Sequence, residues 1–120
     1  MRELAILATA RELDSQFEWA AHEDEALREG ISAELIDAIR YRHTLDGVAE
    51  ADAIVITLAH EIFGAREVSP ETYARCLVHF GRRMLVDLVA LMGNYAATAA
   101  LLTAFDMQLD PGTEPGLPPR

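Results

Sequence analysis

The sequence predicts a single all-α domain, and three observations carry that prediction. Apolar residues recur at helical spacing, helix-capping residues separate the apolar segments, and no stretch shows the alternating pattern of a strand. A chain of 120 residues is long enough to form one domain with its own core. We expect about six helices over residues 1–105. Residues 106–120 should form an extended or disordered tail, because four of the five prolines lie there.

The first two helices are expected on either side of Asp14. Met1–Leu13 consists of strong helix formers, with apolar residues at helical spacing. The second helix should begin after Ser15, because Ser15 and Glu18 form an S-x-x-E capping box in which the Glu18 carboxylate bonds the Ser15 amide. Phe17, Ala20, Ala21 and Leu27 give this helix an apolar side.

Glycines and serines mark the next boundaries. Gly30 is expected to end the second helix, and Ser32 to cap a third that continues to about His43. A turn at Asp46–Gly47 leads into a fourth helix, predicted over Val48–Phe63.

The last two helices are predicted on either side of Gly81. Ser69 and Pro70 form an N-cap and first-turn pair that opens a fifth helix, which stops at Gly81. The sixth, from Met84 to about Phe105, is apolar nearly all round, so we expect it to be the most buried element.

The run Leu85–Phe105 is also long enough for comparison with a membrane span. Asp87 and Asn94 interrupt it, and no positively charged cluster follows it. The sequence therefore predicts a buried helix and no membrane partner.

The amino-acid composition limits the kinds of molecule that the protein is expected to bind. The formal net charge of −10 argues against a nucleic-acid partner or an anionic membrane surface. Because 51% of the residues are apolar, we expect another subunit to cover part of that surface, giving a homo-oligomer. The single cysteine, Cys76, excludes an internal disulfide. Together with a first segment unlike a signal peptide, it predicts a cytoplasmic protein.

Candidate catalytic residues lie in the segment Ser15–Ser32. Glu18 and His22 are four residues apart, which places them on one face of a helix, one turn apart. Two interpretations stay open for this pair. In the first, Glu18 serves the capping box and His22 is a solvated histidine among acidic neighbours. In the second, both face a pocket where carboxylates favour the imidazolium and make His22 a proton donor.

Motifs of several enzyme classes do not occur in the sequence. It has no H-E-x-x-H, paired E-x-x-H, C-x-x-C, G-x-G-x-x-G or G-x-S-x-G pattern. The sequence therefore predicts no metal and no cofactor. Cys76 is expected to be a small buried apolar residue, and Trp19, the only tryptophan, is expected in the core, at an interface or as a ligand platform.

One segment fits the pattern E-W-x-x-H-x-x-x-A-x-x-x-G-[hydrophobic]-S, and the residues that match are Glu18, Trp19, His22, Ala26, Gly30, Ile31 and Ser32. In this pattern, and in R-E-L-A-I-L at Arg2–Leu7, the chain resembles the carboxymuconolactone decarboxylase family from Arg2 to about Leu109. The resemblance implies an alkylhydroperoxidase D-like helical fold that assembles as a trimer or a hexamer, with pockets near the subunit contacts.

The resemblance also implies a reaction and a set of site residues. The family's named reaction is the decarboxylation of a carboxylated muconolactone to an enol-lactone, which needs a proton donor and an anion-binding group. On this basis His22 would donate the proton and Glu18 would orient it. Arg11, or an Arg of a neighbouring subunit, would bind the substrate carboxylate. Trp19 and Tyr95 would complete the substrate pocket.

Other functions follow from the same resemblance. The similar alkylhydroperoxidase D peroxidases depend on C-x-x-C-x-x-x-H, and Ser15 and Glu18 stand where the two cysteines belong, so we expect no thiol peroxidase activity. A non-enzymatic oligomer that binds a small apolar ligand near Trp19 and Tyr95 is one alternative to the lyase. A structural or partner-binding protein without a pocket is the other.

Overall fold

The computed structural model describes residues 1–119, so Arg120, the last residue of the expected tail, lies outside the described residues. The described residues are all-helical and contain no strand, which confirms the predicted fold class. Their helices are α1 (Arg2–Glu12), α2 (Gln16–Arg28), α3 (Ala33–Arg40), α4 (Glu50–Ala59), the π-helix η1 (His60–Ala65) and α5 (Pro70–Ala104).

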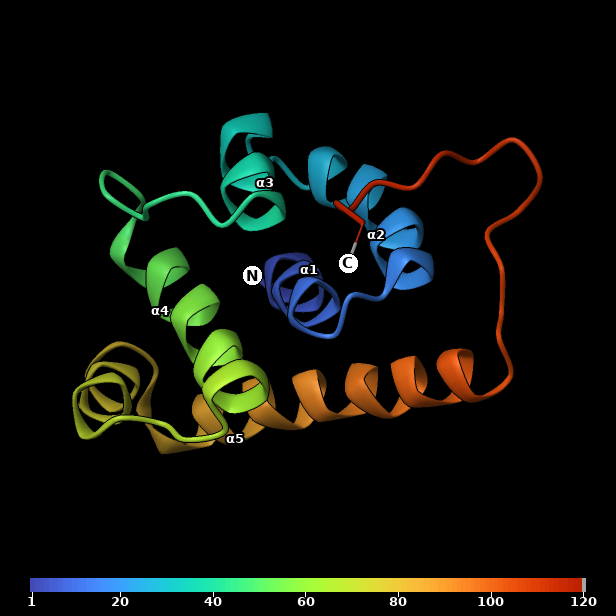
Figure 1. The fold of residues 1–120 in the computed structure, drawn as a ribbon. Helices are drawn as coiled ribbons and strands as arrows, with labels where there is room; N and C mark the ends of the chain where they lie inside the picture. Colours follow the sequence, from blue (N-terminus) through green and yellow to red (C-terminus); the bar gives the residue numbers. More distant parts are fainter. Residues whose placement is uncertain (120) are drawn as a thin grey trace.

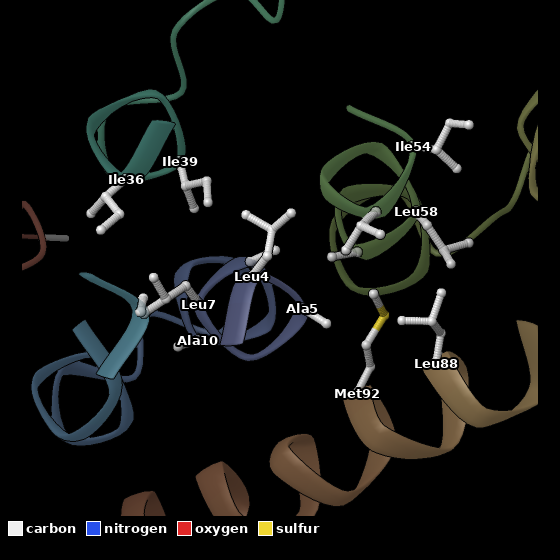
Figure 2. Close-up of a cluster of buried hydrophobic side chains, with 14 of the residues drawn as sticks. Leu4, Ala5, Leu7, Ala10, Ile36, Ile39, Ile54, Leu58, Leu88 and Met92 are labelled. Atoms are coloured by element: carbon white, nitrogen blue, oxygen red, sulfur yellow. The ribbon is translucent and has the colours of Figure 1, made fainter. Parts of the chain in front are cut away.

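Helix α1 is the centre of the fold. Figure 1 shows it nearly end-on, with α2, α3, α4 and α5 arranged around it. Every residue from Glu3 to Ala10 is buried. In Figure 2, Leu4, Ala5 and Leu7 point from α1 in different directions, toward side chains of the surrounding helices. A helix that is apolar on all sides is stable only when it is enclosed in this way.

The prediction that the helix at Met84–Phe105 is the most buried element was wrong. In this part of α5 only Leu88, Met92 and Ala99 are buried, whereas Val86 and Leu101 are 60% and 61% exposed. The inner strip of α5 packs against α1 and α4 (Figure 2). Because α1 already fills the centre of a small domain, α5 lies on its outside and keeps an exposed apolar face.

The break predicted at Gly81 is present. Gly81 has φ 75° and ψ 167°, a non-helical backbone conformation inside α5 that glycine adopts without steric cost. In Figure 1 the part of α5 before this residue turns away from the long part that follows it.

The predicted N-caps are confirmed. Ser15, Ser32 and Ser69 each accept a hydrogen bond on the side-chain oxygen from the amide three residues later. The prediction that the Glu18 carboxylate bonds the Ser15 amide was wrong. The amide of Ser15 donates to the carbonyl of Ala10 at 2.8 Å, and the Glu18 carboxyl makes no return bond. Glu18 is therefore not held at the helix end.

The fourth helix differs from its prediction over Val48–Phe63. The α-helix ends at Ala59 and the chain continues as the π-helix η1. The residue that follows η1, Arg66, has a left-handed conformation with φ 62°. Glu61 ties η1 to the start of α5, because its carboxylate accepts bonds from the Ser69 amide, at 2.6 Å, and from the Thr72 hydroxyl. Burial alone would raise the pKa of Glu61, but these bonds outweigh it and the pKa is lowered.

The tail returns to the helices after a long loop (Figure 1). The Gln16 side-chain amide donates to the Leu117 carbonyl at 2.8 Å and accepts from the Leu117 amide at 2.9 Å. Arg40 donates to the Gly116 carbonyl at 2.5 Å. Leu117 is only 4% exposed, and Gly116 lies against Trp19 so closely that an added Cβ would be 2.6 Å from the ring atom Cδ1. The tail therefore covers Trp19.

Replacing Gln16 by alanine should release the tail and expose Trp19. Both bonds to Leu117 are lost, and the tail has few other anchors. We expect a red shift of tryptophan emission and more efficient quenching by acrylamide. Gln108→Ala is the control, since the Gln108 side chain bonds only Asp106 among the described residues. An unchanged spectrum and unchanged quenching in Gln16→Ala would show that the tail does not shield the ring.

Candidate functional site

Helices α1, α2 and α5 bring five polar or aromatic residues together. We call them the His22 site: Arg2, Glu3, Glu18, His22 and Tyr95. Arg2 and Glu3 come from the first turn of α1, Glu18 and His22 from neighbouring turns of α2, and Tyr95 from α5. Among the predicted site residues, the structure thus brings Tyr95 to His22.

The side of α2 that faces the core is not its apolar side. The apolar side is formed by four residues, none of which is buried: Phe17, Ala20, Ala21 and Leu27. The buried residues are Glu18, Trp19 and Ala26. Trp19 supplies the largest apolar surface of the helix, and burying it turns Glu18, its neighbour in sequence, inward as well. This rotation places a carboxyl group inside the protein.

The imidazole of His22 is held by Glu3. The distance from His22 Nδ1 to Glu3 Oε2 is 2.8 Å, and the side chains of His22 and Glu3 are 21% and 7% exposed. A carboxylate only accepts hydrogen bonds, so Nδ1 carries the proton in this pair. Nε2 is left as the nitrogen that can give or take a second proton. Glu3 therefore holds the imidazole in this structure, and the Glu18 carboxyl makes no hydrogen bond to it.

Tyr95 and Arg2 form the outer part of the site. The His22 and Tyr95 rings are in edge contact, with centroids 5.2 Å apart and an interplanar angle of 87°. Arg2 donates to the Tyr95 hydroxyl at 3.3 Å, and its guanidinium carbon lies 5.8 Å from the centre of that ring. An exposed cation thus lies on the tyrosine ring that contacts the imidazole.

Arg11, the predicted anion-binding residue, lies near the other end of α1. Nine residues separate it from Arg2, which is about 14 Å along a helix. Its guanidinium donates to the Arg40 carbonyl at 2.8 Å and to Asp14 at 3.0 Å. Arg2 is therefore the arginine of α1 that lies on the His22 side of the fold, where it contacts Tyr95.

Glu18 is the most unusual ionisable group of the site. It is 3% exposed, and neither of its carboxyl oxygens has a hydrogen-bond partner among the described residues. Desolvation by burial raises the pKa of Glu18 to about 7. The carboxyl group is therefore neutral in a large fraction of molecules at neutral pH.

Trp19 is fully buried, and its ring nitrogen has no hydrogen-bond partner among the described residues. The guanidinium carbon of Arg40, on α3, lies 5.3 Å from its ring centre, and Gly116 of the tail lies on the ring. These neighbours belong to α3 and the tail, whereas Tyr95 belongs to α5. Trp19 and Tyr95 are thus in different surroundings.

Glu3 and Arg2 were not among the site residues predicted from the sequence. They are the only charged residues among the first ten, directly before an apolar run, and that isolation is the signal that marks them. An acidic residue in the first turn of a helix is ordinarily explained by the helix dipole, so its position alone does not indicate a role in a site. Only the enclosure of α1 shows that Glu3 is buried and needs a partner.

A metal site and a reactive cysteine have less support in the described part of the chain. Residues 1–119 contain no group of three or more His, Cys, Asp or Glu side chains that could hold a metal ion. Cys76 is fully buried, and burial raises the pKa of its thiol, which disfavours the reactive thiolate.

The chain matches no protein-family model, no curated protein and no solved structure. The fold and the site define an all-α protein with a buried carboxyl group, whose pKa is raised to about 7, one helical turn from a carboxylate-bound imidazole.

Proposed function

We propose that this protein is a carboxymuconolactone decarboxylase-like lyase or isomerase, which acts on a small cyclic carboxylate or lactone by acid–base catalysis at the His22 site. The observation that carries the proposal is the pairing of two different acids one helical turn apart. His22 has its Nδ1 fixed by Glu3 at 2.8 Å, and Glu18 has a pKa of about 7. A buried carboxyl group with a raised pKa, one helical turn from an imidazole whose orientation is fixed, is typical of general acid–base sites.

The chemistry of the proposed reaction requires an anion-binding group and a proton donor. The bond between the ring carbon and the carboxylate breaks, and CO2 leaves. The electron pair moves through the ring double bond to the carbon beside the lactone carbonyl, and that carbon takes a proton. In our proposal Arg2 binds the substrate carboxylate and His22 delivers the proton from Nε2.

Glu18 contributes to this proposal through its charge. The protein is strongly acidic, with a formal net charge of −10, so an anionic substrate meets a repulsive field. A neutral Glu18 removes one negative charge from the neighbourhood of the substrate. Because its pKa is about 7, activity should fall as the pH rises above about 7 and Glu18 ionises.

Replacing His22 by alanine should abolish turnover while leaving the fold intact. The assay is proton NMR of γ-carboxymuconolactone incubated with the purified protein. We expect loss of the carboxylate with the wild-type chain, and a rate lower by roughly 100-fold or more for His22→Ala, which lacks the proton donor. Glu3→Gln should give a smaller loss, because the imidazole stays but loses its charged partner.

His79→Ala serves as the matched control, since His79 lies on α5 before the Gly81 break, away from the His22 site. A wild-type rate in His22→Ala would contradict the assignment of His22. An unchanged lactone with the wild-type chain would remove the named reaction.

The proposed protein is a cytoplasmic homo-oligomer, a trimer or a hexamer, with no nucleic-acid or membrane partner. Support comes from a ridge of exposed apolar or small residues at helical spacing along α5: Val86, Val89, Gly93, Ala97 and Leu101. A second copy of the chain that covers this ridge would also bury residues close to Tyr95. Light scattering tests the proposal: a mass several times the 13.2 kDa of the chain supports it, and a single-chain mass contradicts it.

By length and apolar composition alone, α5 is also long and apolar enough to cross a membrane. Only 17% of its apolar 18-residue segment is buried. We favour assembly over a membrane for this face. The opposite side of α5 packs Leu88 and Met92 into the core, so crossing a bilayer would remove both from it.

One observation favours the alternative, a non-enzymatic oligomeric module that binds a small molecule or serves as structure. The Glu18 oxygens have almost no exposed surface, and His22 is only 21% exposed, which leaves little room for a substrate in the single chain. The lactone assay separates the two functions, because a binding module leaves the lactone intact at every pH.

A further inference from the structure

A second site lies near the opposite end of α1 from the His22 site. It is a cavity of about 260 Å³ between α1, α3, α4 and the start of η1, which we call the η1 cavity. Its walls are largely apolar and include Ala8, Ile39 and Ile56. A cavity of about 150 Å³ is sufficient for benzene, so this one has space for a single ring with a substituent.

The rim of the η1 cavity carries a hydrogen-bonded cluster of charged and polar side chains. Glu12, whose side chain is 7% exposed, accepts hydrogen bonds from Arg42 at 2.6 Å and from His60 Nδ1 at 3.1 Å. His60 Nδ1 also lies 3.4 Å from Arg42 Nη1, but the contact with Glu12 is shorter. Because the Glu12 carboxylate only accepts, Nδ1 carries the proton in that bond, and Nε2 has no hydrogen-bond partner among the described residues. Arg42 engages Glu12 through one nitrogen, so its other donors have no partner among the described residues.

The backbone around this cluster is specialised in three places. Arg42 has a left-handed conformation, with φ 52°, which is uncommon for a residue other than glycine. His60 begins the π-helix, a feature often found at functional sites. A side chain at Gly64 would have to displace the cluster, because its Cβ would lie 2.8 Å from Glu12 Oε1 and 3.0 Å from His60 Nδ1. The conformation of η1 thus depends on the same cluster that forms the rim.

The balance of charge at the rim indicates the class of ligand. Arg42, His60 and His43 all line the cavity and can donate hydrogen bonds, whereas Glu12 is the one acidic residue in its lining. Arg11 also lines it, but its guanidinium is already bonded to Asp14 and to the Arg40 carbonyl. The free donors therefore exceed the acceptors, which suits a ligand that supplies a carboxylate.

We propose that the η1 cavity binds a small apolar carboxylate, whose ring or short chain lies between α1, α3 and α4 and whose carboxylate bonds Arg42 and His60. This site is separate from the His22 site, and the inference does not depend on the reaction proposed there. Occupancy would place an additional anion in the hydrogen-bonded cluster that fixes η1.

The test uses benzoate as the probe and amide NMR shifts of the labelled full chain as the readout. We expect saturable shifts in α1, α3 and α4 around the cavity. Benzamide, which has the same ring and no charge, should bind at least about 10-fold more weakly, as should benzoate to Arg42→Gln. Arg28→Gln is the matched control, because Arg28 is exposed on α2 and, within residues 1–119, pairs only with Glu25. Its affinity for benzoate should equal that of the wild type.

Two further variants keep the result decisive. Thr57→Leu fills the cavity without changing its charges and should abolish the shifts even if Arg42→Gln fails to fold. His22→Ala should bind benzoate normally. The proposal is overturned by an absence of saturable shifts, by equal binding of benzamide, by normal benzoate binding to a folded Arg42→Gln or Thr57→Leu, or by loss of binding in His22→Ala.

Discussion

Replacing Glu18 by glutamine should make the protein more stable above neutral pH and remove much of the pH dependence of its unfolding. In the folded chain the pKa of Glu18 is about 7, compared with 4.5 for an unperturbed glutamate. Between these values the folded state binds more protons than the unfolded state, so the free energy of unfolding falls as the pH rises through this range. The difference corresponds to roughly 3 kcal/mol lost by about pH 8.5.

Urea denaturation of both proteins at several pH values measures this effect. Glutamine resembles the neutral acid in shape and cannot ionise, so Glu18→Gln should keep at about pH 8.5 most of the stability that the wild type has at about pH 5. Asp24→Asn is the control, since Asp24 is exposed on the same helix. Parallel pH profiles of wild type and Glu18→Gln would mean that the Glu18 carboxyl is not desolvated in the folded chain.

Replacing Leu7 by alanine should cost about 2–5 kcal/mol of stability, whereas Leu101→Ala should change the stability of the single chain by less than about 0.5 kcal/mol. Leu7 is fully buried in α1, and its removal leaves a cavity in the centre of the molecule. Leu101 is 61% exposed on α5. Both substitutions remove the same atoms, so the difference between them reports burial alone.

Thermal or urea unfolding at low protein concentration measures this contrast, because dilution separates chain stability from any assembly through α5. Equal losses for the two variants would contradict the arrangement in which α1, and not the apolar part of α5, forms the core. In the proposed oligomer, Leu101→Ala should instead weaken the assembly.

Local signals in the sequence were sufficient for most element boundaries. Ser15, Ser32 and Ser69 cap helices as predicted, because a cap depends on a few neighbouring residues. The break at Gly81 is likewise a local property of a residue that tolerates positive φ. The π-helix was not predictable in this way, since His60 and Gly64 take their positions partly from contacts with Glu12 on α1.

Burial was harder to predict, and the site depends on it. A helical pattern shows which residues share a side, but not which side meets the core. The apolar content of Met84–Phe105 suggested the centre of the fold, whereas α1 occupies it. The spacing of Glu18 and His22 identified one face of α2, and the resemblance supplied Tyr95. Glu3 is the partner of His22, and it could not be predicted because it reaches His22 only when α1 passes through the middle of the domain.

The most direct test of the proposed acid–base site is a carbon NMR titration of the side-chain carboxyl groups of the labelled protein. The Glu18 signal is assigned by its absence in Glu18→Gln. We predict that this carboxyl titrates with a midpoint near pH 7, as its desolvated position requires. A midpoint near 4.5 would show that Glu18 is ionised at neutral pH, and the proposal of a neutral acid beside His22 would then be wrong.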